Sequence, residues 1–359
     1  MFPADRSSGC CSPTATSLSA VTSFLRSAFR RLPQVLRRDE RIATLERQLT
    51  IDAEREERSF DVPSFRRYIY AERRIADHLR QLDDSDRGHL VTRKLKSYAF
   101  ARSFGVDVPE IFGIWDRPED IAWAELPDHV VVKSAKGTAA RGVIPLRRAE
   151  DGWSTVTSTE TIDPPEIVHG LTALEAAGRV GGPYFAEELL GGGAGNALPV
   201  DVKVHAFYGV ISHVLLRRVT VHRDSAATAF RVILPDGTDP GPIVRGLVHD
   251  HAIPVPPNLD ELMEAGRRMS LGIPRAFIRV DLYDIDGRIV FGELTPRPGH
   301  LMDYGPKEDE RLGHLWEQAH ARVMNDALGG AGFAVRFGPG PRELVVGGQT
   351  YVPDGVSPL

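Results

Sequence analysis

The sequence predicts a mixed α+β fold, and three observations support this prediction. Two β-rich runs, residues 276–283 and 288–295, flank an Asp-Gly turn signal. Apolar residues recur at helical spacing in other stretches, most clearly at 90–104 and 258–272. Hydrophobic residues make up 42% of the 359 positions and charged residues 26%, as in folded globular proteins. A chain of this length exceeds one domain core, so we expect two or three subdomains.

The first forty residues differ in composition from the rest of the chain. Residues 1–17 are rich in Ser, Thr and Pro, which predicts disorder. Residues 18–38 carry scattered apolar side chains among five arginines and form a basic, loosely amphipathic tail. This tail could touch a membrane surface weakly, act as a transit peptide, or be a flexible lead into a helix. No apolar run approaches the roughly 20 residues that a membrane-spanning helix needs.

Charge and cysteine content narrow the choice of partners and location. The formal net charge of -5 provides no polycation for nucleic acid, so we expect no nucleic-acid partner. The only cysteines, Cys10 and Cys11, are adjacent, so they cannot form a disulfide that links distant parts of the chain. This favours a reducing, cytoplasmic location. The sequence leaves the oligomeric state open, with a dimer as one option.

Hydrophobic spacing and turn signals predict the other elements in chain order. Helices are expected at 40–57, 64–82, 90–104, 258–272 and 312–328, and strands at 106–113, 128–132, 143–146, 183–190, 200–209, 210–221 and the two hairpin runs. The helix at 90–104 should end at Gly105, a natural C-cap. The helix at 258–272 has a capping-box-like start and a glycine at its end.

A glycine-bearing loop lies between two of the predicted strands. It begins at Lys133, at the end of the first strand, and continues through Lys136, Gly137 and Thr138 to Gly142. Successive backbone N–H groups in such a loop can cradle an anion, so the segment is a candidate phosphate-covering loop. The alternative is an ordinary hairpin turn.

Two carboxylates stand among apolar residues on the two runs of the late hairpin. A buried carboxylate needs a partner cation, and Asp281 and Glu293 together could hold Mg²⁺. A two-residue turn would pair Asp281 with Gly292 and direct Glu293 to the other face of the hairpin. A three-residue loop with a bulge would place both acids on one face, and we predict this shifted register. The alternative is an amphipathic hairpin with two solvated acids.

The ordered set of motifs resembles the ATP-grasp superfamily. It comprises a helix Lys, a strand-end Lys, the glycine loop, Glu-Glu-x-Leu, Asp-x-Lys, Arg-x-Asp and Glu-x-Thr-x-x-Pro-Gly. The nearest resemblance is to the TupA-like branch, named after a teichuronopeptide-biosynthesis protein, which has similar Arg-Val-Asp-Leu-Tyr and Phe-Gly-Glu-Leu-Thr strands. The match covers roughly residues 90–329. It implies two α+β subdomains that clasp ATP, preceded by a helical N-terminal region.

The resemblance also implies a division of the chain. The expected parts are a tail at 1–38, a helical and pre-grasp region at 39–125, a small subdomain with the glycine-rich lid at 126–190, a large subdomain with the metal site at 191–330, and a C-terminal extension at 331–359.

The resemblance assigns the nucleotide-binding roles residue by residue. Lys94, with Lys96 as a competitor, and Lys133 would reach the ATP phosphates, and the segment containing Lys136, Gly137, Thr138 and Gly142 would be the lid. The remaining roles, in chain order, are Glu187 for the adenine amino group, backbone groups of Glu188 and Leu190 for the ring edge, Asp201 for the ribose, and Lys203 for the phosphates.

The metal and substrate roles follow in the same way. Asp281 and Glu293 would bind Mg²⁺, normally two ions, with Glu293 bridging them. Many ATP-grasp ligases have Asn where this chain has Thr295, whose oxygen can still serve as a hard ligand. Arg279 would stabilise the reacting carboxylate, and Arg297 and His300 could contact the acid substrate.

The resemblance therefore implies an ATP-dependent carboxylate–amine ligase that acts through an acyl phosphate, in cell-surface polymer or natural-product biosynthesis. Its partners would be a small-molecule or polymer carboxylate and an amine. Two alternatives are a kinase that phosphorylates a hydroxyl group and a nucleotide-binding regulator without turnover. His205 and His213 are expected to be packed or solvated rather than catalytic, and no Cys/His zinc spacing stands out.

Overall fold

The structure is a computed structural model, and it describes residues 41–42, 44–49, 62–82, 93–137, 141–156, 161–191, 198–220, 228–298 and 303–357. The chain forms two compact units, residues 1–62 and 63–359. In the first unit, residues 41–42 and 44–49 are helical, within the helix predicted at 40–57. The tail predicted at 1–38 lies outside the described residues.

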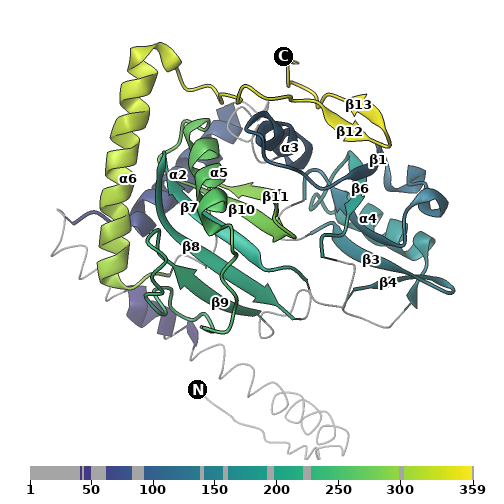
Figure 1. Cartoon of the computed structure of the whole chain (residues 1–359), viewed down its shortest axis with the longest axis horizontal. Helices are drawn as coiled ribbons and strands as arrows, with labels where there is room; N and C mark the ends of the chain where they lie inside the picture. Colours follow the sequence, from purple (N-terminus) through teal and green to yellow (C-terminus); the bar gives the residue numbers. More distant parts are fainter. Residues whose placement is uncertain are drawn as a thin grey trace, which may run out of the picture. The chain divides into compact units, whose positions relative to one another are not determined.

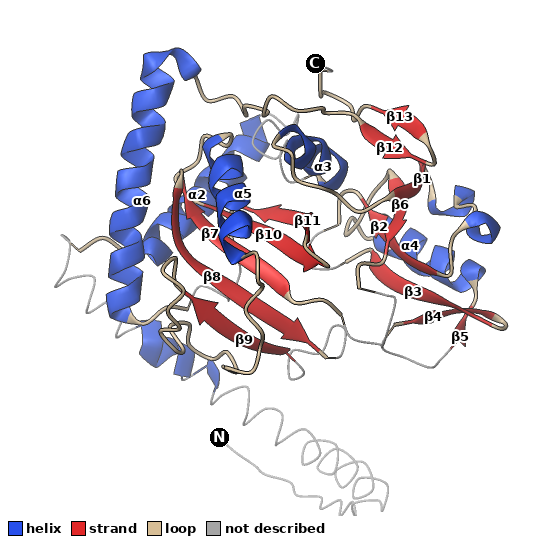
Figure 2. Ribbon diagram, viewed as in Figure 1, coloured by secondary structure: helices blue, strands red, loops and turns tan. Residues whose placement is uncertain are grey.

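Within its described residues, the second unit contains two β-sheets and five longer helices, so the predicted α+β class is confirmed (Figures 1 and 2). The helices are α2 (Phe65–Leu82), α3 (Lys94–Ser103), α4 (Pro164–Ala176), α5 (Leu259–Leu271) and α6 (Pro306–Asp326). Among the described residues, no helix combines the length and apolar character that crossing a bilayer requires.

One sheet has five antiparallel strands in the order β11-β10-β7-β8-β9. Its strands are β7 (Asp201–Phe207), β8 (Val210–Val219), β9 (Thr228–Ile233), β10 (Ile278–Ile285) and β11 (Arg288–Thr295). The strands β7 and β10 alternate between apolar and charged residues, as a sheet with one polar face does. The helix α5 covers the apolar face, where a Cβ on Gly266 would lie 2.7 Å from Val204 (Figure 1).

The other sheet has eight strands in the order β13-β12-β1-β6-β2-β3-β4-β5. Its strands are β1 (Ile111–Trp115), β2 (His129–Ser134), β3 (Val143–Ala149), β4 (Gly152–Thr155), β5 (Thr161–Ile162), β6 (Tyr184–Glu188), β12 (Leu344–Val346) and β13 (Gln349–Tyr351). Only β1 and β12 pair in parallel within this described sheet. The C-terminal segment therefore adds strands beside β1.

The helix α3 contacts both sheets through one aromatic side chain. The ring of Tyr98 lies edge-on to Phe185 of β6 and to Phe291 of β11, with ring centroids 6.1 and 5.9 Å apart. The helix ends as predicted, because Gly105 has a φ of +74° and its N–H donates to the carbonyl of Arg102. This helix therefore carries its polar side chains to the place where the two sheets meet.

The late hairpin has the predicted pairing but reaches it in a different way. Asp281 lies opposite Glu293, so the acids share one face. The loop, however, is a tight two-residue turn, in which Asp286 and Gly287 have φ values of +53° and +84°. The extra residue is Gly292, a bulge within β11 rather than in the loop. A Cβ at this position would lie 2.9 Å from the ring of Tyr283, so the bulge accommodates glycine best.

Several predicted boundaries were wrong for identifiable reasons. The helix α6 begins at Pro306 rather than at residue 312, because proline is well tolerated in the first turn of a helix. The strand predicted at 106–113 begins only at Ile111. Asn258 makes no side-chain cap bond to α5. The glycine after α5, Gly272, has a φ of -75°, and it is required because a Cβ there would lie 2.5 Å from the carbonyl oxygen of Arg336.

Candidate functional site

The polar face of the five-stranded sheet carries a layer of charged side chains. Alternate positions of β7, β10 and β11 supply them, and cross-strand pairing brings them side by side. Lys203 and Arg279 are 3% and 5% exposed, and Asp281 is 2% exposed. The layer contains Asp201, Lys203, Arg279, Asp281, Glu293 and Thr295. These are six of the residues predicted from the sequence.

Three oxygen-bearing groups converge on one nitrogen of Arg279. Its Nη2 lies 2.6 Å from Asp281 Oδ2, 3.3 Å from Glu293 Oε1 and 3.1 Å from Thr295 Oγ1. Its Nε also donates to the second oxygen of Asp281, at 2.6 Å. Glu293 is 61% exposed, so it borders the buried layer while its neighbours lie within it. The oxygens of Asp281, Glu293 and Thr295 therefore surround a cationic nitrogen of Arg279.

Lys203 joins the same layer from the adjacent strand. Its ammonium group lies 2.6 Å from Asp281 and 2.5 Å from Asp201. Arg217 approaches Asp201 at 3.5 Å from β8. The other carboxylate oxygen of Asp201, Oδ1, is buried and has no hydrogen-bond partner among the described residues. An unpaired buried acceptor is costly, so this oxygen is suited to receive a donor from a ligand.

The cationic neighbours keep Asp281 ionised. Burial alone would raise the pKa of Asp281, but Arg279 and Lys203 overcome this effect and lower the pKa to about 2. The carboxylate is therefore a permanent anion at neutral pH.

Two buried histidines lie beside this layer and are neutral. The rings of His205 and His213 stack with centroids 4.1 Å apart, and His213 also contacts the hydroxyl of Tyr304 at 3.1 Å. Burial and the positive charge of Arg279 lower the pKa of His205 to about 3. Both side chains are thus packed, and neither is poised to exchange protons near pH 7.

A second polar cluster joins α3, β2 and β6. Lys133 forms an ion pair with Glu187, which is 2% exposed. The hydroxyl of Tyr98 donates to Glu187 at 2.6 Å and accepts from Lys133 at 3.2 Å. Tyr98 was not predicted as a site residue, although its position one helical turn after Lys94 places both on one face of α3.

Lys94 reaches the base of the glycine loop. Its ammonium group donates to the carbonyls of Ser134, at 2.7 Å, and Gly137, at 2.8 Å. Burial and the nearby charge of Lys133 lower the pKa of Lys94 to about 8. Its competitor Lys96 lies instead beside Gly355, where a Cβ would be 3.0 Å from the lysine nitrogen. The structure thus brings Lys94, and not Lys96, to the loop.

The glycine loop has a tight base. Gly142 has a φ of +65°, and its carbonyl accepts from Ser134 N–H at 2.8 Å. A Cβ on Gly142 would lie 2.9 Å from Ser134 and Val180, so only glycine fits without displacement. Lys136 is exposed, and Thr138 lies outside the described residues.

Glu188 and Leu190, predicted to contact the adenine ring, lie at the end of β6 and just after it. Arg288 of β11 donates to both carboxylate oxygens of Glu188, at 2.7 and 3.0 Å. The backbone N–H of Glu188 donates to Glu110, so this group is already engaged, and Leu190 is buried.

The structure describes only one of the two residues predicted to contact the acid substrate. The charge of Arg297 acts on Glu72 of α2: burial raises the pKa of Glu72, and Arg275 and Arg297 oppose the rise. His300 lies outside the described residues.

One comparison with known proteins covers the later motifs of the chain. Residues 187–317 match the family described as TupA-like ATPgrasp, which confirms the resemblance to that branch. This segment contains the charged layer of the five-stranded sheet. No curated protein matches the chain.

Solved structures with related folds include several ligases. A D-alanine–D-alanine ligase from Bacillus anthracis gives a TM-score of 0.43 at 16% identity, over 67% of this chain and 70% of that one. D-cycloserine synthetase DcsG gives 0.38 at 17% identity, over 65% and 70%. The ATP-grasp ligase PsnB, in complex with a precursor variant, Mg and ADP, gives 0.38 at 18% identity, over 67% of this chain and 61% of that one.

Proposed function

We propose that this chain belongs to the TupA-like branch of the ATP-grasp superfamily and is an ATP-dependent carboxylate–amine ligase. The observation that carries the proposal is the convergence of Asp281, Glu293 and Thr295 on a single cationic nitrogen. The family match over the same strands supports this assignment. The substrate class is proposed as a carboxylic acid, small or polymeric, and an amine.

The oxygen donors suit Mg²⁺. Magnesium prefers carboxylate, hydroxyl and phosphate oxygens, and it is commonly held by one or two carboxylates together with substrate phosphates. Asp281 and Glu293 would provide the carboxylates, and Thr295 a further oxygen. The three acids of the layer are offset by Lys203, Arg279 and Arg217, so a magnesium–triphosphate unit would enter a site close to neutral.

Other side chains suit the nucleotide. The unpaired Oδ1 of Asp201 could accept from ribose hydroxyls. Lys94 and Lys133 would reach the phosphates after exchanging some of their present contacts with the loop and with Glu187. Both carboxylate oxygens of Glu187 already have partners, Lys133 and Tyr98. We therefore propose that Glu187 accepts a hydrogen bond from adenine while it keeps these two contacts.

The chemistry follows from charge and position. ATP would supply its γ-phosphoryl group to the substrate carboxylate, and an amine would then displace phosphate to give an amide. Arg279 would hold the substrate carboxylate and stabilise the charge that develops on its oxygens. Lys203 would neutralise phosphate oxygens, and the loop up to Gly142 would exclude water from the activated acid.

A hydroxylamine trapping experiment tests the proposal. The purified chain is incubated with ATP, Mg²⁺, hydroxylamine and a panel of carboxylic acids, and ADP and hydroxamate are both measured. We expect matching amounts of ADP and hydroxamate for the preferred acid, because only an activated acyl group yields a hydroxamate. ADP with a phosphorylated alcohol and no hydroxamate would indicate a kinase, and ATP binding with no ADP for any acid would indicate a regulator.

Glu293→Gln provides the matched test of the metal assignment. It should lower ADP formation by about 100-fold or more, the size expected when one group that stabilises the transition state is lost. Because Glu293 is 61% exposed, its unfolding midpoint should change little. Glu264→Gln, a surface acid on α5 across the sheet, should retain normal turnover. Normal turnover in Glu293→Gln would contradict the assignment.

A further inference from the structure

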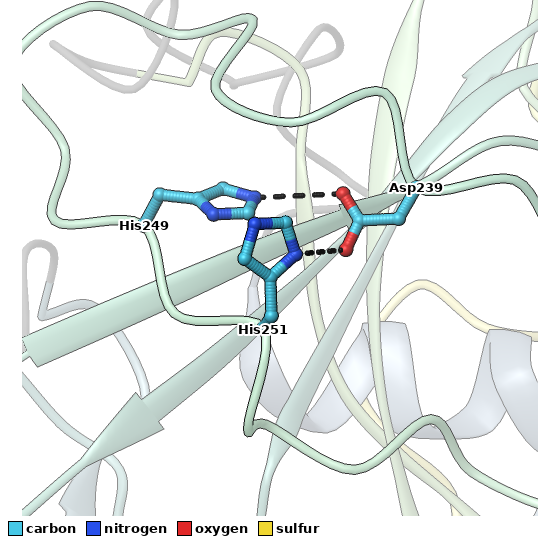
Figure 3. Close-up of side chains that lie close together, drawn as sticks. All are labelled: Asp239, His249 and His251. Carbon is cyan, nitrogen blue, oxygen red and sulfur yellow. Dashed lines mark hydrogen bonds and ion pairs between the residues drawn. The ribbon is translucent and has the colours of Figure 1, made fainter.

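A separate cluster of metal-ligating side chains lies beyond the edge strand β9. Asp239, His249 and His251 belong to the long connection that follows this strand. One potential ligand atom from each residue lies within 4.8 Å of the others. Figure 3 shows both imidazole rings on one side of the Asp239 carboxylate, each directed toward one of its oxygens. The strands β8, β7 and β10 separate β9 from β11, so this cluster is distinct from the layer that contains Glu293.

The contacts within the cluster are short and converge on the carboxylate. His251 Nδ1 lies 2.8 Å from Asp239 Oδ2, and His249 Nε2 lies 3.6 Å from Asp239 Oδ1. His249 Nε2 is buried and has no hydrogen-bond partner among the described residues. His251 is 71% exposed, so the site is accessible from solvent. An ordinary hydrogen-bonded Asp–His pair would account for His251, but it leaves the buried nitrogen of His249 unexplained.

Surrounding groups hold the carboxylate in place. Arg231 of β9 donates to Asp239 Oδ2 at 2.9 Å, and the same guanidinium group donates to the carbonyl of Ile253. The N–H of Gly241 donates to Asp239 Oδ1 at 2.9 Å. Outer hydrogen bonds of this kind are typical around metal-binding carboxylates, because they orient the ligand.

We propose that Asp239, His249 and His251 bind a divalent transition-metal ion such as Zn²⁺, with at least one coordination position left to water. Two imidazole nitrogens and one carboxylate oxygen form a recurrent ligand set for zinc and its neighbours, whereas Mg²⁺ prefers oxygen ligands alone. This site is independent of the proposed ligase reaction.

The geometry requires only a small adjustment. Ligand atoms around a tetrahedral zinc ion lie about 3.4 Å apart, close to the present separation of His249 and Asp239. The ion would replace the proton that His251 and Asp239 share, and the exposed ring of His251 can turn to allow this. Asp239 can bind through Oδ1 and keep its Oδ2 bond to Arg231.

A bound ion would fasten the connection to the sheet. Residue His249 pairs with Phe230 of β9 through an isolated bridge, and Asp239 stands ten residues earlier in the connection. Because the ion would bind the folded connection and not the unfolded chain, its binding free energy would add to the stability of this connection. We therefore assign the site a structural role as a clip on the edge strand.

Metal titration of the full chain tests the site. The protein, stripped of metal and of any purification tag, is titrated with Co²⁺ while visible absorption is recorded, and with Zn²⁺ in competition with a chromophoric chelator. We expect one equivalent to bind and the thermal midpoint to rise with Zn²⁺. His251→Ala should weaken binding at least about 10-fold, since even the loss of an outer ligand contact has effects of that size.

Two controls make the result specific. His314→Ala removes another exposed histidine that lies near a carboxylate, Glu317 on α6, and should not alter Zn²⁺ affinity. Glu293→Gln should also bind Zn²⁺ normally, which separates this site from the proposed magnesium site. Equal Zn²⁺ affinity in wild type and His251→Ala, in protein shown to be folded by circular dichroism, would overturn the proposal. Absence of any stoichiometric binding to wild type would overturn it as well.

Discussion

The stability of the protein in acid should depend in part on the carboxyl group of Asp281. Its pKa is lowered from 3.8 to about 2 in the folded chain by Arg279 and Lys203, against the opposing effect of burial. A carboxyl group whose folded pKa is depressed stabilises the protein fully above its unfolded pKa. That contribution is lost as the pH falls through the folded value.

The size of the effect follows from the difference between the two pKa values. A lowering of just under two units corresponds to about 2 kcal/mol of stability at neutral pH, and about half of this should be lost by pH 3. In Asp281→Asn, the residue cannot ionise, and Lys203 and Arg279 face a neutral amide. Breaking a buried ion pair in this way typically costs about 3–5 kcal/mol at pH 7.

Urea unfolding at pH 7, 5, 4 and 3 measures the effect for wild type and Asp281→Asn. The gap between the two proteins should narrow by about 1 kcal/mol from pH 7 to pH 3. In this range the Asp281 carboxyl group of the unfolded wild-type chain takes up a proton, while that of the folded chain stays mostly ionised. Val280→Ala is the matched control, since it alters a fully buried neighbour on the same strand without a titrating group. Its gap to wild type should stay constant with pH. A constant gap for Asp281→Asn would refute the reasoning.

Two further predictions concern the second polar cluster and the glycine loop. Tyr98→Phe should destabilise the chain by about 1–3 kcal/mol in urea unfolding, because buried Glu187 loses a donor, whereas the exposed Tyr70→Phe should change stability by less than about 0.5 kcal/mol. An unchanged free energy of unfolding for Tyr98→Phe would contradict the hydrogen bond from Tyr98 to Glu187. Gly142→Ala should lower the thermal midpoint, since its φ of +65° and close neighbours exclude a Cβ, while Gly170→Ala, in open space within α4, should raise or preserve it.

Much of the charged layer could be predicted because alternation along a strand is a local property. The pattern Asp201-Val-Lys203-Val places both charged residues on one face, and Arg279 and Asp281 follow the same rule. The end of α3 was also predictable, because Gly105 is the residue that adopts the left-handed conformation most readily.

Features that depend on the meeting of distant segments could not be predicted in this way. The choice between Lys94 and Lys96 depends on where the loop and Gly355 lie around α3. An extra residue in the loop and an extra residue at Gly292 would both place Asp281 opposite Glu293, so the sequence pattern does not distinguish them. The actual position depends on how β11 packs beside Tyr98 and Tyr283. The sequence shows His249 and His251 as a His-x-His pair, but only the folded connection brings Asp239 to them.

The glycine bulge has a consequence for how the late hairpin can vary. Strand residues normally alternate between faces, yet Phe291 enters the apolar core while Glu293, two positions later, joins the acids. The bulge at Gly292 thus lies between the turn of the hairpin and the end that carries Asp281 and Glu293. Extensions at the tip that keep the strands paired would leave the acids opposite each other, whereas one residue added between Gly292 and Thr295 would turn an oxygen donor away. Natural or engineered changes of length should therefore be tolerated at the tip and excluded from those few positions.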